Sequence, residues 1–157
     1  MHRIATLAVV ALAGCPAPAT RSSLPPTGGA VIAGVKGTIE QWRQAYELRS
    51  IDALGKLYAH EPTLTITQEG IAMFGWSSIE VTLRDKLAHA TQIRIRIKDV
   101  QVTSLAPGAA FAIATMTRER SEGAATTLEN GALTLILRND GEHWLIVAEH
   151  YSYNRPS

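Results

Sequence analysis

The first part of the folded region carries apolar residues at helical spacing. Between residues 35 and 48 they recur every three or four positions, so that they share one face of a helix. Ser50 offers a side-chain cap for a second, shorter helix that continues to about Tyr58. The same spacing indicates a third helix over residues 78–90. The pattern therefore predicts three helices, each with one face turned toward a core.

Beyond Thr91 the apolar residues alternate with polar ones, which is typical of strands with one buried face. Arg94, Arg96 and Lys98, for example, alternate with three isoleucines. Helices followed by a four-strand meander predict an α+β domain with a curved antiparallel sheet. After this first strand, the predicted strands cover residues 109–119, 128–138 and 144–153, and a short hairpin over residues 63–68 and 71–74 precedes the third helix.

The N-terminus has the pattern of an export signal. A basic start is followed by an apolar run over residues 4–13, which is far shorter than the ~20 residues that a membrane-spanning helix needs. The stretch Leu12-Ala13-Gly14-Cys15 resembles a bacterial lipobox. We expect secretion through the Sec pathway, cleavage before Cys15, and attachment of a lipid anchor carrying diacylglycerol and palmitate to its thiol. An ordinary signal peptide cut elsewhere, or an incidental cysteine, remain the alternatives.

The segment after Cys15 is rich in Pro and Gly and poor in apolar residues, so it is predicted to be a tether. The predicted organisation is a signal peptide over residues 1–14, a tether over residues 15–34 and one domain over residues 35–157. Pro16 follows the cysteine where an aspartate would favour the inner membrane. We therefore expect an envelope lipoprotein on the periplasmic face of the outer membrane.

The net charge and the positions of the histidines argue against two classes of function, nucleic-acid binding and metal binding. The formal net charge is +1, and loss of Arg3 with the leader brings the mature chain to neutrality, which argues against nucleic-acid binding. The basic row Arg94, Arg96 and Lys98 is interpreted as a solvated strand face, with anionic lipid head groups as the alternative. The histidines show no metal-ligand spacing, so neither a metal nor a cofactor is expected.

Several short motifs support a family resemblance. The motifs are Trp42, Ser50-x-Asp52-Ala53-Leu54-x-x-Leu57-Tyr58-Ala59, Gly75-Trp76-x-x-Ile79, Leu135-Ile136-Leu137-Arg138-x-Asp140-Gly141-x-x-Trp144-x-Ile146 and His150-x-Ser152. In the order and spacing of these motifs the chain resembles the SnoaL-like branch of the nuclear transport factor two-like superfamily over residues 35–153. This resemblance implies a cone-shaped, cystatin-like fold in which a bent sheet wraps around three helices and leaves one end open.

The resemblance places a pocket inside the cone, and we expect it to bind a small apolar molecule without catalysis. The expected pocket residues are Trp42, Tyr46, Tyr58, Trp76, His150 and Ser152.

Two alternatives remain open. The first is a cyclase, isomerase or hydratase in which His150 acts as the general base, since imidazole titrates near neutral pH. The second is an interaction module that forms a homodimer through the outer face of the sheet. The face of the last strand opposite His150 is more apolar than a solvated face needs; it carries Leu145, Val147, Glu149, Tyr151 and Tyr153.

Overall fold

The computed structural model describes residues 28–154. The predicted signal peptide, Cys15 and most of the predicted tether lie outside these residues. Within the described part of the chain, no helix is both long enough and apolar enough to cross a membrane.

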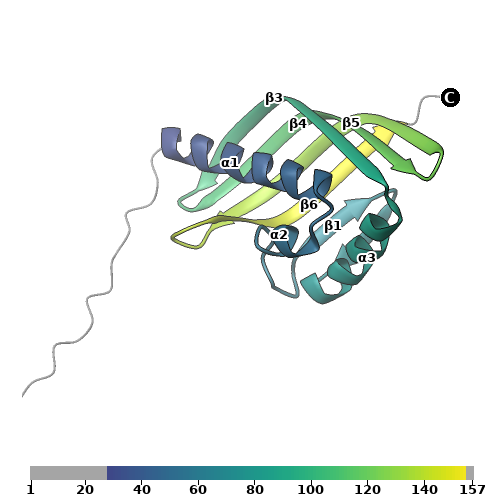
Figure 1. The fold of residues 1–157 in the computed structure, drawn as a ribbon. Helices are drawn as coiled ribbons and strands as arrows, with labels where there is room; N and C mark the ends of the chain where they lie inside the picture. Colours follow the sequence, from purple (N-terminus) through teal and green to yellow (C-terminus); the bar gives the residue numbers. More distant parts are fainter. Residues whose placement is uncertain (1–27, 155–157) are drawn as a thin grey trace, which may run out of the picture.

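Helix α1 (Gly28–Glu47) lies along the concave side of the long strands (Figure 1). It begins at Gly28, inside the predicted tether and before the predicted helical pattern that starts at residue 35. Val31 and Val35 are buried one turn apart and continue the spacing of the later apolar residues. Burial of these valines outweighs the poor helix propensity of the glycines around them, whose composition resembles that of a linker.

The sheet contains six strands in the order β2-β1-β6-β5-β4-β3. The four long strands form the predicted antiparallel meander, and the short hairpin β1–β2 joins it through parallel pairing of β1 with β6. The predicted α+β class with a curved sheet is confirmed. The strands are β1 (Thr65–Gln68), β2 (Ile71–Phe74), β3 (Gln92–Ala106), β4 (Ala109–Glu122), β5 (Ala125–Asn139) and β6 (Trp144–Asn154).

Two further helices complete the fold. Helix α2 (Ile51–Gly55) is capped by Ser50, whose side-chain oxygen accepts a hydrogen bond from the backbone N–H of Ala53 at 3.2 Å. Helix α3 (Trp76–His89) lies beside β1, at the opposite end of the molecule from the start of α1 (Figure 1). Both helices and α1 pack on the same side of the sheet, so the predicted three-helix layer is present.

A β-bulge in β6 decides which of its side chains enter the core. The pairing of β6 with β5 skips Val147, which makes it an extra residue in the ladder. Before the bulge, Trp144 and Ile146 are buried; after it, Glu149 and Tyr151 are buried instead. An extra residue reverses the in-and-out alternation of everything that follows, because side chains along a strand repeat every two positions.

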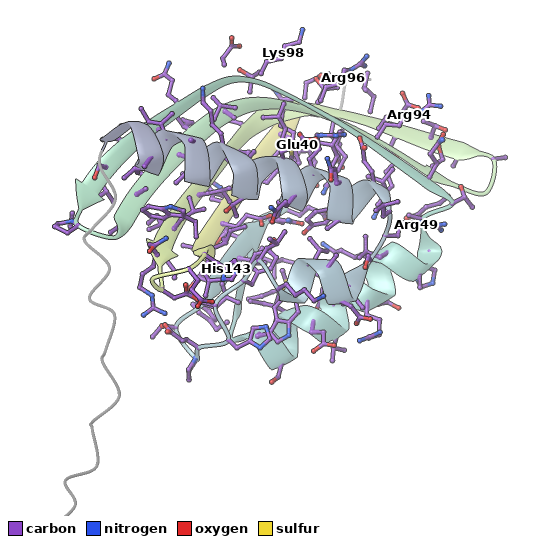
Figure 2. The ribbon with its side chains drawn as sticks, turned by 60° about the vertical axis from the view of Figure 1, so that its left-hand side comes forward. Glu40, Arg49, Arg94, Arg96, Lys98 and His143 are labelled. Carbon is purple, nitrogen blue, oxygen red and sulfur yellow. The ribbon has the colours of Figure 1, made fainter. Side chains whose placement is uncertain are left out.

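The outer edge of the sheet is polar. Figure 2 shows Arg94, Arg96 and Lys98 in a row along β3, with side chains pointing away from the molecule, and all three are exposed. Charged side chains on an edge strand discourage pairing with another chain. Their placement agrees with the interpretation of this row as a solvated face.

Candidate functional site

The centre of the interior is a carboxylate held by three donors from three elements. Glu149 on β6 is 2% exposed. Its Oε2 atom accepts hydrogen bonds from the Tyr58 hydroxyl and, at 3.1 Å, from the Trp42 indole N–H. Its Oε1 atom accepts a bond of 2.8 Å from the Gln68 amide. Helix α1, the segment after α2 and strand β1 are thereby joined to β6 through one buried group.

Burial governs the acidity of this cluster. It raises the pKa of Glu149 above the ordinary value of 4.5, and the hydrogen bonds from Tyr58, Gln68 and Trp42 only partly oppose the shift. Burial and the neighbouring Glu149 carboxylate likewise raise the pKa of the Tyr58 hydroxyl. The Trp42 N–H also lies 2.8 Å from the Tyr58 oxygen. Glu149 and its three donors form one polar network inside the core.

Tyr46 stands next to this network without a hydrogen bond of its own. It is 3% exposed, and its hydroxyl has no hydrogen-bond partner within residues 28–154. Burial raises the pKa of this hydroxyl, with a further contribution from the charge of Glu149, while the nearby Tyr58 and Gln68 act in the opposite direction. Its ring packs against Trp42, with 4.5 Å between the ring centres. A buried polar group without a partner is costly and calls for an explanation.

A buried ion pair lies near Tyr46. The Arg118 guanidinium on β4 donates to Oε2 of Glu129 on β5 at 2.7 Å. The guanidinium also lies 4.9 Å from the centre of the Tyr151 ring. Burial lowers the pKa of Arg118, but the Glu129 carboxylate outweighs this, so Arg118 stays charged.

These groups meet at a small pocket, which we name the mouth pocket. It lies where α1, α3 and the ends of β1, β3 and β4 converge, and its volume is about 20 Å³. That is room for one group of the size of a water molecule. Its lining consists of Tyr46, Gln68, Glu69, Leu83, Lys86, Leu87, Ile93, Arg118 and Arg120.

The structure brings together three of the predicted pocket residues. Trp42, Tyr46 and Tyr58 are buried side by side, but only Tyr46 lines the mouth pocket. Trp76 is half-buried; its ring stacks on Tyr58 at 5.4 Å on one side and on His60 at 5.1 Å on the other. Trp76 therefore packs between the interior and the surface and does not reach the pocket.

The predicted positions of His150 and Ser152 are wrong. Both are exposed, because the bulge at Val147 turns them to the outer side of the sheet. The same shift brings Glu149 and Tyr151 inside, although the strict alternation predicted them on the outer face. His150 is therefore too far from the interior to act as a base there.

Sequence reasoning missed Gln68, Arg118 and Glu149. Arg118 was not among the predicted site residues, yet a signal for its burial existed. It continues the alternation of small and apolar residues on β4 that runs through Ala114 and Met116, all of them buried. For Glu149 no such signal existed, since its face depends on the bulge.

Metal binding has no support in this geometry. Among residues 28–154, no group of three or more histidine, cysteine, aspartate or glutamate side chains is placed to hold an ion. The His60 Nε2–H donates to the Gly55 carbonyl oxygen at 2.8 Å, and the His89 Nδ1–H donates to the Asp85 carbonyl oxygen of its own helix at 2.8 Å.

Comparison with known proteins now gives the family. The model of the SnoaL-like domain matches residues 35–156. The chain belongs to the SnoaL-like domain family. No curated protein matches it in sequence.

Solved structures agree with this assignment to the SnoaL-like family. A nuclear transport factor 2-like superfamily protein from Salmonella enterica superimposes with a TM-score of 0.75 at 14% identity, over 83% of this chain and 96% of that one. A Novosphingobium aromaticivorans protein, provisionally named an aromatic ring hydroxylase, gives 0.75 at 13% identity over 83% and 94%. A dehydratase from Streptomyces avermitilis, also provisionally named, gives 0.73 at 15% over 82% and 99%. At these identities the likeness shows the shared fold alone.

Proposed function

We propose that this SnoaL-like domain binds a small molecule at the mouth pocket, with the polar group of the ligand turned toward Tyr46, Gln68 and Arg118. The Tyr46 hydroxyl carries the proposal. It is buried, lines the pocket and has no partner within the described chain. A ligand oxygen in the pocket would give it one, and would remove the cost of leaving it unpaired.

The size of the pocket sets the binding mode. Trp42 and Tyr58 are both buried and bond to each other and to Glu149, so they belong to the packed core rather than to the wall of the mouth pocket. About 20 Å³ admits only one polar group. The remainder of the ligand then rests at the entrance against Leu83, Leu87 and Ile93. An apolar molecule with one polar end fits this arrangement.

A screen of small molecules by thermal shift tests the proposal. Lys86 lines the pocket from α3 and is half-buried, so Lys86→Trp should cover the entrance without disturbing the core. Asp85→Trp, one residue earlier, adds the same ring to an exposed position that is not part of the lining. We expect compounds that stabilise the native protein and Asp85→Trp but not Lys86→Trp. Absence of any stabilising compound, or equal responses from both variants, would overturn the proposal.

Proton transfer by Glu149 is a second candidate. Its raised pKa and its bond from Tyr58 are features of catalytic carboxyl groups. Both oxygens of Glu149 are occupied by donors, however, and Glu149 does not line the mouth pocket. Binding is therefore better supported. If a reaction is found, Glu149→Gln should abolish it while leaving ligand affinity within about twofold; an active Glu149→Gln protein would exclude this candidate.

We also propose that the chain is a lipoprotein of the cell envelope, anchored through Cys15. The lipobox-like sequence and the single cysteine support this. Cys15→Ser should move the protein from the membrane to the soluble fraction after cell fractionation. Unchanged membrane partitioning would contradict the anchor and leave an ordinary exported domain.

A further inference from the structure

We infer that the ligand of the mouth pocket is a small carboxylic acid, bound as its carboxylate, with an apolar body at the entrance. The inference rests on the proposed function and specifies the chemical class of the ligand. It comes from the kinds of groups that line the pocket and from what already occupies them.

The polar groups at the bottom of the pocket are chiefly donors. Arg118 can only donate, and its position is fixed by the ion pair with Glu129. The Tyr46 hydroxyl is buried and has no hydrogen-bond partner among the described residues. Gln68 uses one amide N–H on Glu149 and has a second. A ligand group that accepts hydrogen bonds can use the Tyr46 hydroxyl, the Arg118 guanidinium and the second Gln68 N–H.

The charges around the pocket favour an anion over a neutral acceptor. Three cationic side chains line it, Lys86, Arg118 and Arg120, against the single carboxylate of Glu69. Arg118 is paired with Glu129, and Arg120 lies 3.0 Å from exposed Glu122. A carboxylate accepts from several donors at once and binds charged donors more strongly than an amide does.

The remaining wall is apolar. Leu83 and Leu87 from α3 and Ile93 from β3 form one side of the pocket, and all three are otherwise buried. Because the pocket has space for a single polar group, the body of the acid lies at its entrance. An aromatic or short aliphatic acid has these proportions.

Matched acids and amides test the inference with the full-length protein. Benzoate and hexanoate, with benzamide and hexanamide as neutral partners of the same shape, are titrated while the indole N–H signal of Trp42 is followed by NMR. We expect each acid to bind at least about tenfold more tightly than its amide, which corresponds to ~1.4 kcal/mol. Lys86→Gln and Arg120→Gln should each weaken the acids about three- to tenfold and leave the amides unchanged.

Two tyrosine variants distinguish binding at the mouth pocket from a general effect of removing a buried hydroxyl. Tyr46→Phe should weaken the acids about tenfold. Tyr151→Phe also removes a buried hydroxyl that has no partner in the described chain, but Tyr151 does not line the pocket. The affinity of this variant for the acids should therefore equal that of the native protein. If acids and amides bind equally well and both lose affinity in Tyr46→Phe, the ligand is not selected as a carboxylate, but the proposed function stands. Absence of binding by all four probes, or acid binding that Tyr46→Phe does not change, would overturn the inference.

Discussion

At the residue scale, the main feature of the interior is which of its few buried polar groups have hydrogen-bond partners. Glu149 has a donor for each oxygen, whereas Tyr46 and Tyr151 have buried hydroxyls without partners in the described chain. Trp42, Tyr46 and Tyr58 could be chosen from the sequence because aromatic residues on an inward helical face usually enter the core. Their partners Gln68 and Glu149 could not, because charged and amide side chains in strands are usually exposed.

The raised pKa of Glu149 predicts a pH-dependent stability. The folded protein holds the Glu149 proton more tightly than the unfolded chain, so this group stabilises most below pH 4.5, its ordinary value, and the contribution is lost as the pH rises through the raised pKa. The difference in unfolding free energy between native protein and Glu149→Gln should therefore change steadily from pH 4.5 toward neutrality, to the disadvantage of the native protein. Denaturant unfolding at several pH values measures it; parallel curves would contradict the shift.

The three buried tyrosines should respond differently to loss of their hydroxyls. Tyr58→Phe removes a donor from Glu149 and should cost about 1–3 kcal/mol of unfolding free energy. Tyr46→Phe and Tyr151→Phe remove hydroxyls without partners and should leave the melting temperature unchanged or raise it. Calorimetry of the three variants decides this. A loss of more than about 1 kcal/mol in Tyr46→Phe would mean that another side chain of the native protein bonds its hydroxyl.

At the element scale, periodicity located nearly every helix and strand but not the register of the last one. Spacing of apolar residues is a local property, so the meander and the helices could be predicted. The bulge at Val147 arises from pairing with β5, and no local pattern marks it. For this reason His150 and Glu149 exchanged their predicted faces. The early start of α1 was missed for a different reason, since Gly28 and Gly29 have low helix propensity and only burial of Val31 compensates.

Packing of α1 against β6 gives a prediction with a control in the same helix. A Cβ atom on Gly34 would lie 2.6 Å from the Trp144 ring, whereas one on Gly37 would meet nothing within 4 Å. Gly34→Ala should therefore destabilise the domain by about 1–3 kcal/mol. Gly37→Ala should stabilise it by up to about 1 kcal/mol through helix propensity. Thermal or urea unfolding compares them, and equal effects would show that Trp144 does not pack tightly on α1.

At the scale of the whole molecule, the outer face of the sheet is a candidate interface between two copies. The apolar residues predicted there on β6 are partly inside, but β4 and β5 present Ile113 and Ile136 to solvent, at 38% and 39% exposure. Phe111 pairs with Ile136 in the ladder and adds to the same patch. We therefore keep a homodimer through this face as a proposal.

Ultracentrifugation tests the homodimer. The native protein should sediment as a dimer, and Ile136→Glu should sediment as a monomer with unchanged melting behaviour, because a carboxylate at the centre of an apolar interface would be buried without a partner. Ile71→Glu on β2 is a control, since Ile71 is 63% exposed at the far edge of the sheet. A monomeric native protein would contradict the interface.

The central claim is that the Tyr46 hydroxyl awaits a ligand oxygen in the mouth pocket, and a crystal structure at atomic resolution tests it most directly. We predict an ordered water or ligand oxygen ~2.6–3.0 Å from Tyr46 Oη, between the side chains of Gln68 and Arg118. Such an oxygen would show that the pocket binds a polar group at a defined position. A pocket closed by its own walls, with Tyr46 Oη hydrogen-bonded to Tyr58 or Gln68, would contradict the account.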